Sequence, residues 1–255
     1  MVFTVNVGNT VTSYGVAFSA DDIRFRRTST VETKTDLELM LMFLSFLEEQ
    51  GLRAEDIRAS VLSCVVPPQK SVLIRALKRL TGRDPLVVDA SCACGFTIGL
   101  PEKNELGANL IALSSAVVRD YGVPAILINV GTATSFGLID KDAVFCGGVL
   151  YPGMQNALDA LISRTSLPPM EVEGNTRLTG KNTFDSIQAG VLYGHAGAVD
   201  RILDELLLLA PGAKIVIAGK RARALAGVLR HEASVDDALL LRGLYYIEEA
   251  KGGRP

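Results

Sequence analysis

Hydrophobic and polar residues alternate at the start of the chain in a pattern that predicts three antiparallel strands. The alternation covers residues 2–7, 12–18 and 23–27, with a turn at "SADD" before the third strand. Apolar residues at helical spacing follow over 35–51, where we expect Asp36 to cap the helix. The chain therefore opens with a three-stranded meander followed by a helix.

The remaining pattern alternates strands and helices, and the second half repeats the order of the first. In the first half we expect a strand at 59–66, a helix at 69–82, a short strand at 85–90 and a helix at 105–122. In the second half we expect strands at 125–130, 133–140 and 143–150, a helix after Pro152-Gly153, a loop at 166–181, a long helix at 183–209, a strand at 213–219 and helices at 222–230 and 236–250. The repeated order indicates an internal duplication and an α/β fold in two domains, at residues 1–118 and 119–255.

One short phrase occurs in both halves. "NVGNT" (6–10) and "NVGTATS" (129–135) each place Asn-Val-Gly between two predicted strands. Glycine lets the backbone approach a phosphate closely, and successive N–H groups with hydroxyl or amide side chains form an anion-binding turn. The candidate phosphate-binding residues are Gly8, Asn9 and Thr10 in the first half, and Gly131, Thr132 and Thr134 in the second. Two matching turns predict a nucleotide site, with the turns facing each other across a cleft.

Composition and charge exclude several classes of function. The 255 residues are 48% hydrophobic and 21% charged, which is typical of a soluble globular protein. A net charge of −2 gives no electrostatic reason to expect nucleic acid or an anionic membrane as a partner. No apolar run approaches the ~20 residues that span a bilayer, and residues 1–18 lack the pattern of a secretory signal. We expect a cytoplasmic protein.

The cysteines and histidines form no recognisable metal or catalytic site. The spacing of the cysteines contains no CxxC pair, which favours buried, reduced thiols over a zinc site. Neither histidine has a Cys or Ser placed to form a catalytic pair, so we expect surface or packing roles for both. These residues are Cys64, Cys92, Cys94 and Cys146, with His195 and His231.

Six segments together resemble a known family. They are "VNVGNT" (5–10), "SCVVPP" (63–68), "ELGANL" (105–110), "NVGTATSF" (129–136), "GGVLYPG" (147–153) and "GKNTFDSIQAGVLYG" (180–194). In this order they resemble the motifs of type III pantothenate kinases, which have the actin/sugar-kinase/Hsp70 fold. The resemblance implies two duplicated actin-like (ribonuclease H-like) domains with a nucleotide cleft between them. It also implies phosphorylation of pantothenate in coenzyme A biosynthesis, with ATP, Mg²⁺ and a monovalent cation, K⁺ or NH₄⁺.

The departures from this family are concentrated at its acids. Asn6, Asn109 and Asn129 stand where the family carries aspartates that serve, in that order, metal-linked phosphate binding, general base action and nucleotide or cation binding. Leu110 replaces an arginine, the family's tyrosine has no clear match in "FTIGLPEKN", and "AGK" (218–220) replaces Thr-Gly-Gly. An amide has no charge for Mg²⁺ and is too weak a base to accept a hydroxyl proton. We therefore expect no catalytic residue in this chain.

Three functions remain open at this point. The leading hypothesis is a non-catalytic subunit that forms a heterodimer with an intact type III pantothenate kinase paralogue, in whose site ATP, pantothenate and the cations bind. By the resemblance, Gly107 and Ala108 lie on the substrate side, and Thr183 matches a threonine that the family contributes to the neighbouring subunit's pocket. The first alternative is a divergent active kinase, on pantothenate or another substrate, that recruits Glu105 or Asp140. The second is a ligand-binding regulatory protein without catalysis.

Overall fold

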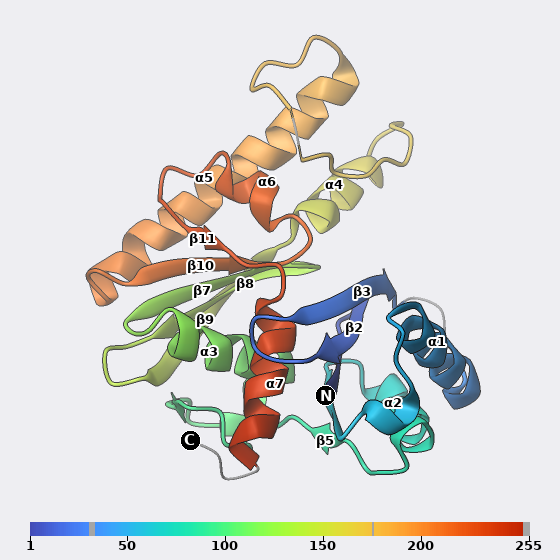
Figure 1. Cartoon of the computed structure of the whole chain (residues 1–255). Coiled ribbons are helices and arrows are strands. Elements are labelled where there is room, and N and C mark those ends of the chain that lie inside the picture. The colour runs from blue at the N-terminus through green and yellow to red at the C-terminus, as the bar shows by residue number, and fades with distance from the viewer. Residues whose placement is uncertain (31–33, 175, 252–255) are drawn as a thin grey trace. The chain divides into compact units, whose positions relative to one another are not determined.

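The chain folds into two compact units, each with its own sheet. The structure, a computed structural model, describes residues 1–30, 34–174 and 176–251 (Figure 1). Unit 1 comprises residues 1–119 together with 238–255, and unit 2 comprises residues 120–237. The C-terminal helix, which the sequence places in the second half of the chain, thus packs within unit 1.

Unit 1 is built around the sheet that the alternation at the start of the chain predicts. Its sheet has the strand order β3-β2-β1-β4-β5, in which β1 is antiparallel to β2 and parallel to β4. The elements are β1 (Val2–Val7), β2 (Val11–Ala17), β3 (Ile23–Ser29), α1 (Asp36–Glu49), η1 (Ala54–Asp56), β4 (Ala59–Cys64), α2 (Pro67–Thr81), β5 (Leu86–Val87), β6 (Thr97–Ile98), η2 (Lys103–Glu105), α3 (Ala108–Asp120) and α7 (Leu239–Lys251).

Helices α1 and α2 bury one face of this sheet. Aromatic rings fill the space between β1, β2 and α1, with ring centroids 5.1 Å apart for Phe3 and Phe43 and 5.4 Å apart for Tyr14 and Phe46. The prediction that Asp36 caps α1 was wrong, because Thr35 caps the helix. The Thr35 hydroxyl accepts a hydrogen bond from the backbone of Glu38, whose carboxylate accepts from the Thr35 backbone in return.

Helix α7 joins unit 1 through packing against β1, β2 and β4. It also approaches α3 closely, because a Cβ atom added at Gly243 would lie 1.7 Å from the carbonyl oxygen of Ala112. The guanidinium of Arg242 donates to the carbonyl of Ala20 at 3.0 Å, and Arg58 pairs with Glu249. These contacts link the end of the chain to its first strands.

Unit 2 repeats the topology of unit 1. The order β11-β10-β7-β8-β9 in its sheet corresponds strand for strand to β5-β4-β1-β2-β3, with β7 antiparallel to β8 and parallel to β10. The predicted α/β fold with duplicated units is thereby confirmed. The elements are β7 (Ala125–Val130), β8 (Ala133–Ile139), β9 (Val144–Pro152), α4 (Met154–Ile162), α5 (Thr183–Leu209), β10 (Lys214–Ala218), α6 (Ala222–Ala226) and β11 (Ser234–Val235).

The core of unit 2 lies between its sheet and the helices α4, α5 and α6 (Figure 1). Leu192, Val199 and Leu203 of α5 pack over Ile126 and Ile128 of β7. The two-residue strands β6 and β11 were not predicted. Residue 175 of the predicted loop lies outside the described residues. No helix in the described ranges combines the length and the apolar character that crossing a membrane requires.

Candidate functional site

The first candidate phosphate turn is a tight hairpin between β1 and β2. The backbone N–H of Gly8 donates to the carbonyl of Val11 at 3.0 Å, and a Cβ atom at Gly8 would lie 3.1 Å from the same oxygen. Asn9 and Thr10 at its tip are exposed, and the Thr10 carbonyl accepts from the N–H of Thr30 at 3.0 Å. The turn has the predicted local geometry, and its binding of phosphate stays a prediction.

Asn6 lies one residue before the end of β1 and is buried. Its side chain is 7% exposed, and its Oδ1 accepts a hydrogen bond of 2.9 Å from the hydroxyl of Ser63, the residue opposite it on β4. The first of the three amides is therefore part of an internal hydrogen bond, at the position where the family resemblance implies a carboxylate.

The second candidate phosphate turn is held by backbone contacts from three segments. The N–H of Gly131 donates to the carbonyl of Ala133, and the N–H of Gly153 donates to the carbonyl of Thr132, both at 3.1 Å. A Cβ atom at Gly153 would lie 2.3 Å from the carbonyl oxygen of Gly131, and one at Gly219 would lie 2.2 Å from that of Val130. Glycine is therefore required at both positions, because a side chain would displace the turn.

A buried hydrogen bond connects this turn to helix α5. Thr134 is fully buried, and its Oγ1 lies 3.0 Å from Nε2 of His195 on α5. Burial lowers the pKa of His195 to about 4, so its ring is neutral at neutral pH. The sequence alone does not connect these two residues, because 61 positions separate them and only the packing of α5 on the sheet brings them together.

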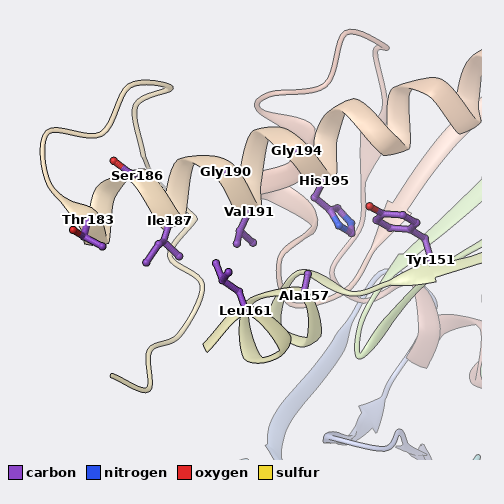
Figure 2. Close-up of a pocket in the computed structure, with 10 residues that line it drawn as sticks. All are labelled: Tyr151, Ala157, Leu161, Thr183, Ser186, Ile187, Gly190, Val191, Gly194 and His195. Carbon is purple, nitrogen blue, oxygen red and sulfur yellow. The ribbon is translucent and has the colours of Figure 1, made fainter. Parts of the chain in front are cut away.

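Helix α5 forms one wall of a groove of about 700 Å³ that lies within unit 2 (Figure 2). We call it the α5 groove; its polar lining residues are Tyr151, Thr183, Ser186 and His195, and the rest are aliphatic residues and glycines of α4 and α5. Asn182 caps α5 by accepting from the N–H of Asp185 at 2.8 Å. The helix cap is thus Asn182, and Thr183, the next residue, lines the groove.

The second and third amides lie in different units. Asn109 is in the first turn of α3, where its Oδ1 would lie 2.8 Å from a Cβ atom at Gly107, and the Gly107 carbonyl accepts from the N–H of Leu110 at 2.8 Å. Ala108 begins this helix. Asn129 lies near the end of β7, opposite Ser135 on β8. The structure thus assigns Asn109 to unit 1 and Asn129 to unit 2.

The described residues do not fit a bound Mg²⁺. Within the described ranges, no group of three or more His, Cys, Asp or Glu side chains is placed to hold a metal ion. Asn6 and Asn129 contribute no negative charge, which this hard cation favours. Asp140 serves its own turn, since its Oδ1 accepts from the N–H groups of Asp142 and Val144 at 2.9 Å each, and these bonds lower its pKa. Glu105 closes the 3₁₀ helix η2.

The expectation of buried cysteines holds for Cys94 but is wrong for Cys146, which is exposed, and Cys64 and Cys92 are partly buried. All four lie in the described ranges and are free thiols. Burial raises the pKa of the thiols of Cys64 and Cys94, which keeps them protonated at neutral pH.

The chain is similar to proteins of a single biochemical family along most of its length. A family described as type III pantothenate kinase matches residues 2–205. A type III pantothenate kinase of Bacillus cytotoxicus is 34% identical over 251 residues, which are 98% of this chain and 96% of the relative.

Solved structures give the same result at the level of the fold. The ROK hexokinase of Thermus thermophilus matches with a TM-score of 0.55 at 15% identity, over 99% of both chains. A ROK family glucokinase of Streptomyces griseus, in complex with glucose and AMPPNP, matches with a TM-score of 0.50 at 11% identity over 95% of this chain and 97% of that one. At these identities the likeness shows the fold alone, the actin-like fold of sugar kinases. By its sequence match over nearly the whole length, this chain belongs to the type III pantothenate kinase family.

Proposed function

We propose that this chain is a non-catalytic subunit of a heteromeric type III pantothenate kinase in coenzyme A biosynthesis. The observation that carries the proposal is the presence of three amides, Asn6, Asn109 and Asn129, where the family resemblance implies carboxylates. An intact paralogue would bind ATP, pantothenate, Mg²⁺ and the monovalent cation in its own site. This chain would complete the partner's pantothenate pocket.

The missing general base is the first chemical argument. Transfer of a phosphoryl group to a hydroxyl of pantothenate requires removal of the hydroxyl proton, and by the resemblance that role falls to the position of Asn109. A carboxamide cannot accept this proton, and loss of a positioned base costs roughly 10²- to 10⁴-fold in rate. Leu110, at the place of an arginine, also removes a positive charge beside this position.

The missing charge is the second argument. Phosphoryl transfer depends on positioning and on neutralising the charge of the phosphates. A unit negative charge ~4 Å from a cation contributes up to about 4 kcal/mol at an effective dielectric constant of ~20. Asn6 cannot supply it, and its Oδ1 already accepts a hydrogen bond from Ser63 at 2.9 Å. These two losses disfavour an independent kinase, while the intact glycines of both turns support retention of the fold.

The α5 groove supports a role toward a partner. Thr183 lines it at the first turn of α5, and the helix cap is provided by Asn182. By the resemblance, this threonine reaches the pocket of the neighbouring subunit. Ser186 lines the same groove, but its hydroxyl donates to the carbonyl of Asn182 at 2.8 Å. The two residues therefore form a matched pair for a test.

The first experiment compares the chain alone with the chain co-expressed with an intact paralogue. Pantothenate phosphorylation should stay at background for the purified chain with Mg-ATP and K⁺ or NH₄⁺, and should appear in the co-purified complex. Robust turnover by the chain alone would refute the proposal in favour of a divergent kinase. Failure to co-purify, together with saturable binding of a nucleotide or pantothenate, would favour a regulatory protein.

The second experiment tests the pocket itself. Thr183→Ala in the complex should weaken apparent pantothenate affinity by the loss of one polar contact, about 0.5–1.5 kcal/mol or roughly 2- to 13-fold. Assembly should remain intact. Ser186→Ala is the matched control and should leave the affinity within error, because its hydroxyl serves the helix. An unchanged Thr183→Ala complex would mean that this chain does not complete the partner's pocket.

A further inference from the structure

The bond between Thr134 and His195 lies where the second phosphate turn meets helix α5. Thr134 is the last residue of that turn, lies on β8 and is fully buried. His195 is 4% exposed, and its Nε2 lies 3.0 Å from the threonine hydroxyl. A neutral imidazole has one donor and one acceptor nitrogen, so it can bond to this hydroxyl in either tautomer.

His195 also borders the α5 groove. Its ring centroid lies 5.3 Å from that of Tyr151, at an interplanar angle of 57°. Figure 2 shows the two rings side by side in the groove, with the hydroxyl end of Tyr151 directed toward the histidine. A single side chain therefore contacts the lining of the groove on one side and the strand that follows the phosphate turn on the other.

Helix α5 connects this point with Thr183. His195 follows Thr183 by 12 positions in one uninterrupted helix, a rise of about 18 Å. The neighbouring contacts of α5 with the sheet are apolar, through Leu192, Ala196 and Val199. Apolar packing is not directional, whereas a buried hydrogen bond fixes distance and angle. The Thr134–His195 bond thus adds a directional contact between α5 and the sheet.

We propose that His195 is a positioning residue, which fixes the register of α5 against the turn Gly131–Thr134 and thereby places Thr183. The consequence for the partner's pocket rests on the proposed function, whereas the coupling between the turn and the start of α5 is a property of this chain alone. The two parts are tested separately.

The first test uses the full chain without a partner. Hydrogen exchange is measured in peptides covering 130–136 and 183–194 for the wild type, His195→Phe, Thr134→Val and the double variant. Phenylalanine keeps the ring beside Tyr151 but removes the bond, and valine keeps the shape of threonine. We expect each single variant to raise exchange at least 3-fold in both peptides, and the double variant to add no further increase.

Rescue and a matched control separate positioning from general loss of packing. His195→Gln places an amide near the location of Nε2 and should return exchange in both peptides to within 2-fold of the wild type. His231→Phe changes the other histidine, which bonds to Asp204 near the far end of α5 at 2.8 Å, and should leave both peptides unchanged. Increased exchange confined to the mutated segment, or no rescue by glutamine, would overturn the proposal.

The second test uses the co-purified complex. His195→Phe should raise the KM for pantothenate by a factor similar to that of Thr183→Ala, with kcat and the KM for ATP changed less than 2-fold. A loss of kcat in the His195→Phe complex with an unchanged KM for pantothenate would overturn the proposal that His195 places Thr183. If Thr183→Ala has no effect while the exchange results hold, the proposed function fails and the coupling within unit 2 stands.

Discussion

Asn6 and Ser63 form a buried side-chain hydrogen bond between the two central strands of unit 1. The hydroxyl of Ser63 donates to Oδ1 of Asn6 at 2.9 Å, and the residues are 0% and 7% exposed. The bond satisfies a polar group that would otherwise be costly to bury. A neutral amide at this place is thus accommodated by the interior of unit 1.

Asn6→Asp should destabilise the chain, because it buries a carboxylate with a single hydroxyl donor. We expect a loss of about 1–3 kcal/mol in the free energy of unfolding at pH 7.5, measured by urea denaturation. The loss should shrink as the carboxyl group becomes protonated at lower pH. Asn9→Asp, at the exposed tip of the neighbouring turn, is the control and should change stability by less than about 0.5 kcal/mol. A rise in melting temperature of the Asn6→Asp variant with Mg²⁺ would instead indicate a latent metal site.

Asn109→Asp should not restore activity. The change returns a carboxylate to the place of the family's base, but Leu110 and Asn129 still lack the charges of the family pattern. We expect pantothenate phosphorylation by the chain alone to stay at background, and that by the co-purified complex to change less than 2-fold. Activity of the isolated Asn109→Asp chain within 10-fold of that of the complex would contradict our proposal that this chain is a non-catalytic subunit.

Gly243→Ala should weaken the attachment of α7 to unit 1. The added Cβ atom would lie 1.7 Å from the carbonyl oxygen of Ala112, so the two helices must move apart. We expect a loss of about 1–3 kcal/mol, as for other overpacked interiors. Gly197→Ala is the opposite control: nothing lies within 4 Å of its Cβ position in α5. Gly197→Ala should stabilise the chain by about 0.5–1 kcal/mol, because alanine has a higher helix propensity than glycine. Equal effects of the two changes on thermal unfolding would contradict the close packing of α7 on α3.

The buried His195 should make stability depend on pH between about 4 and 6.5. Burial lowers its pKa in the folded chain to about 4, below the value of 6.5 for an exposed histidine, so the unfolded chain binds more protons in this window. The stabilising contribution is therefore complete above pH 6.5 and decreases as the pH falls toward 4. Between pH 7.5 and 5 the wild type should lose about 2 kcal/mol more than His195→Gln. Urea denaturation at both pH values measures the free energy of unfolding. Equal losses in the wild type and in His195→Gln would show that His195 is not the responsible group.

Much of the fold follows from local pattern. The alternation over residues 2–7 matches β1 at Val2–Val7, and the long helical spacing over 183–209 matches α5 at Thr183–Leu209. Such segments are predictable because each buries one face, and a period of 2 or 3.6 residues records that face in the sequence. The prediction of the α1 cap was wrong because Thr35 and Asp36 are both good capping residues, and only the hydrogen bond to Glu38 distinguishes them.

The sequence by itself determined the duplicated halves, the two glycine turns and the amides at Asn6, Asn109 and Asn129. These are properties of residue identity and short-range order. Tertiary structure alone decided that Ser63 satisfies Asn6, that α7 returns to unit 1 and that His195 meets Thr134. Each of these pairs residues far apart in the chain, and their contact depends on how helices pack on sheets, which no local pattern of hydrophobic and polar residues records.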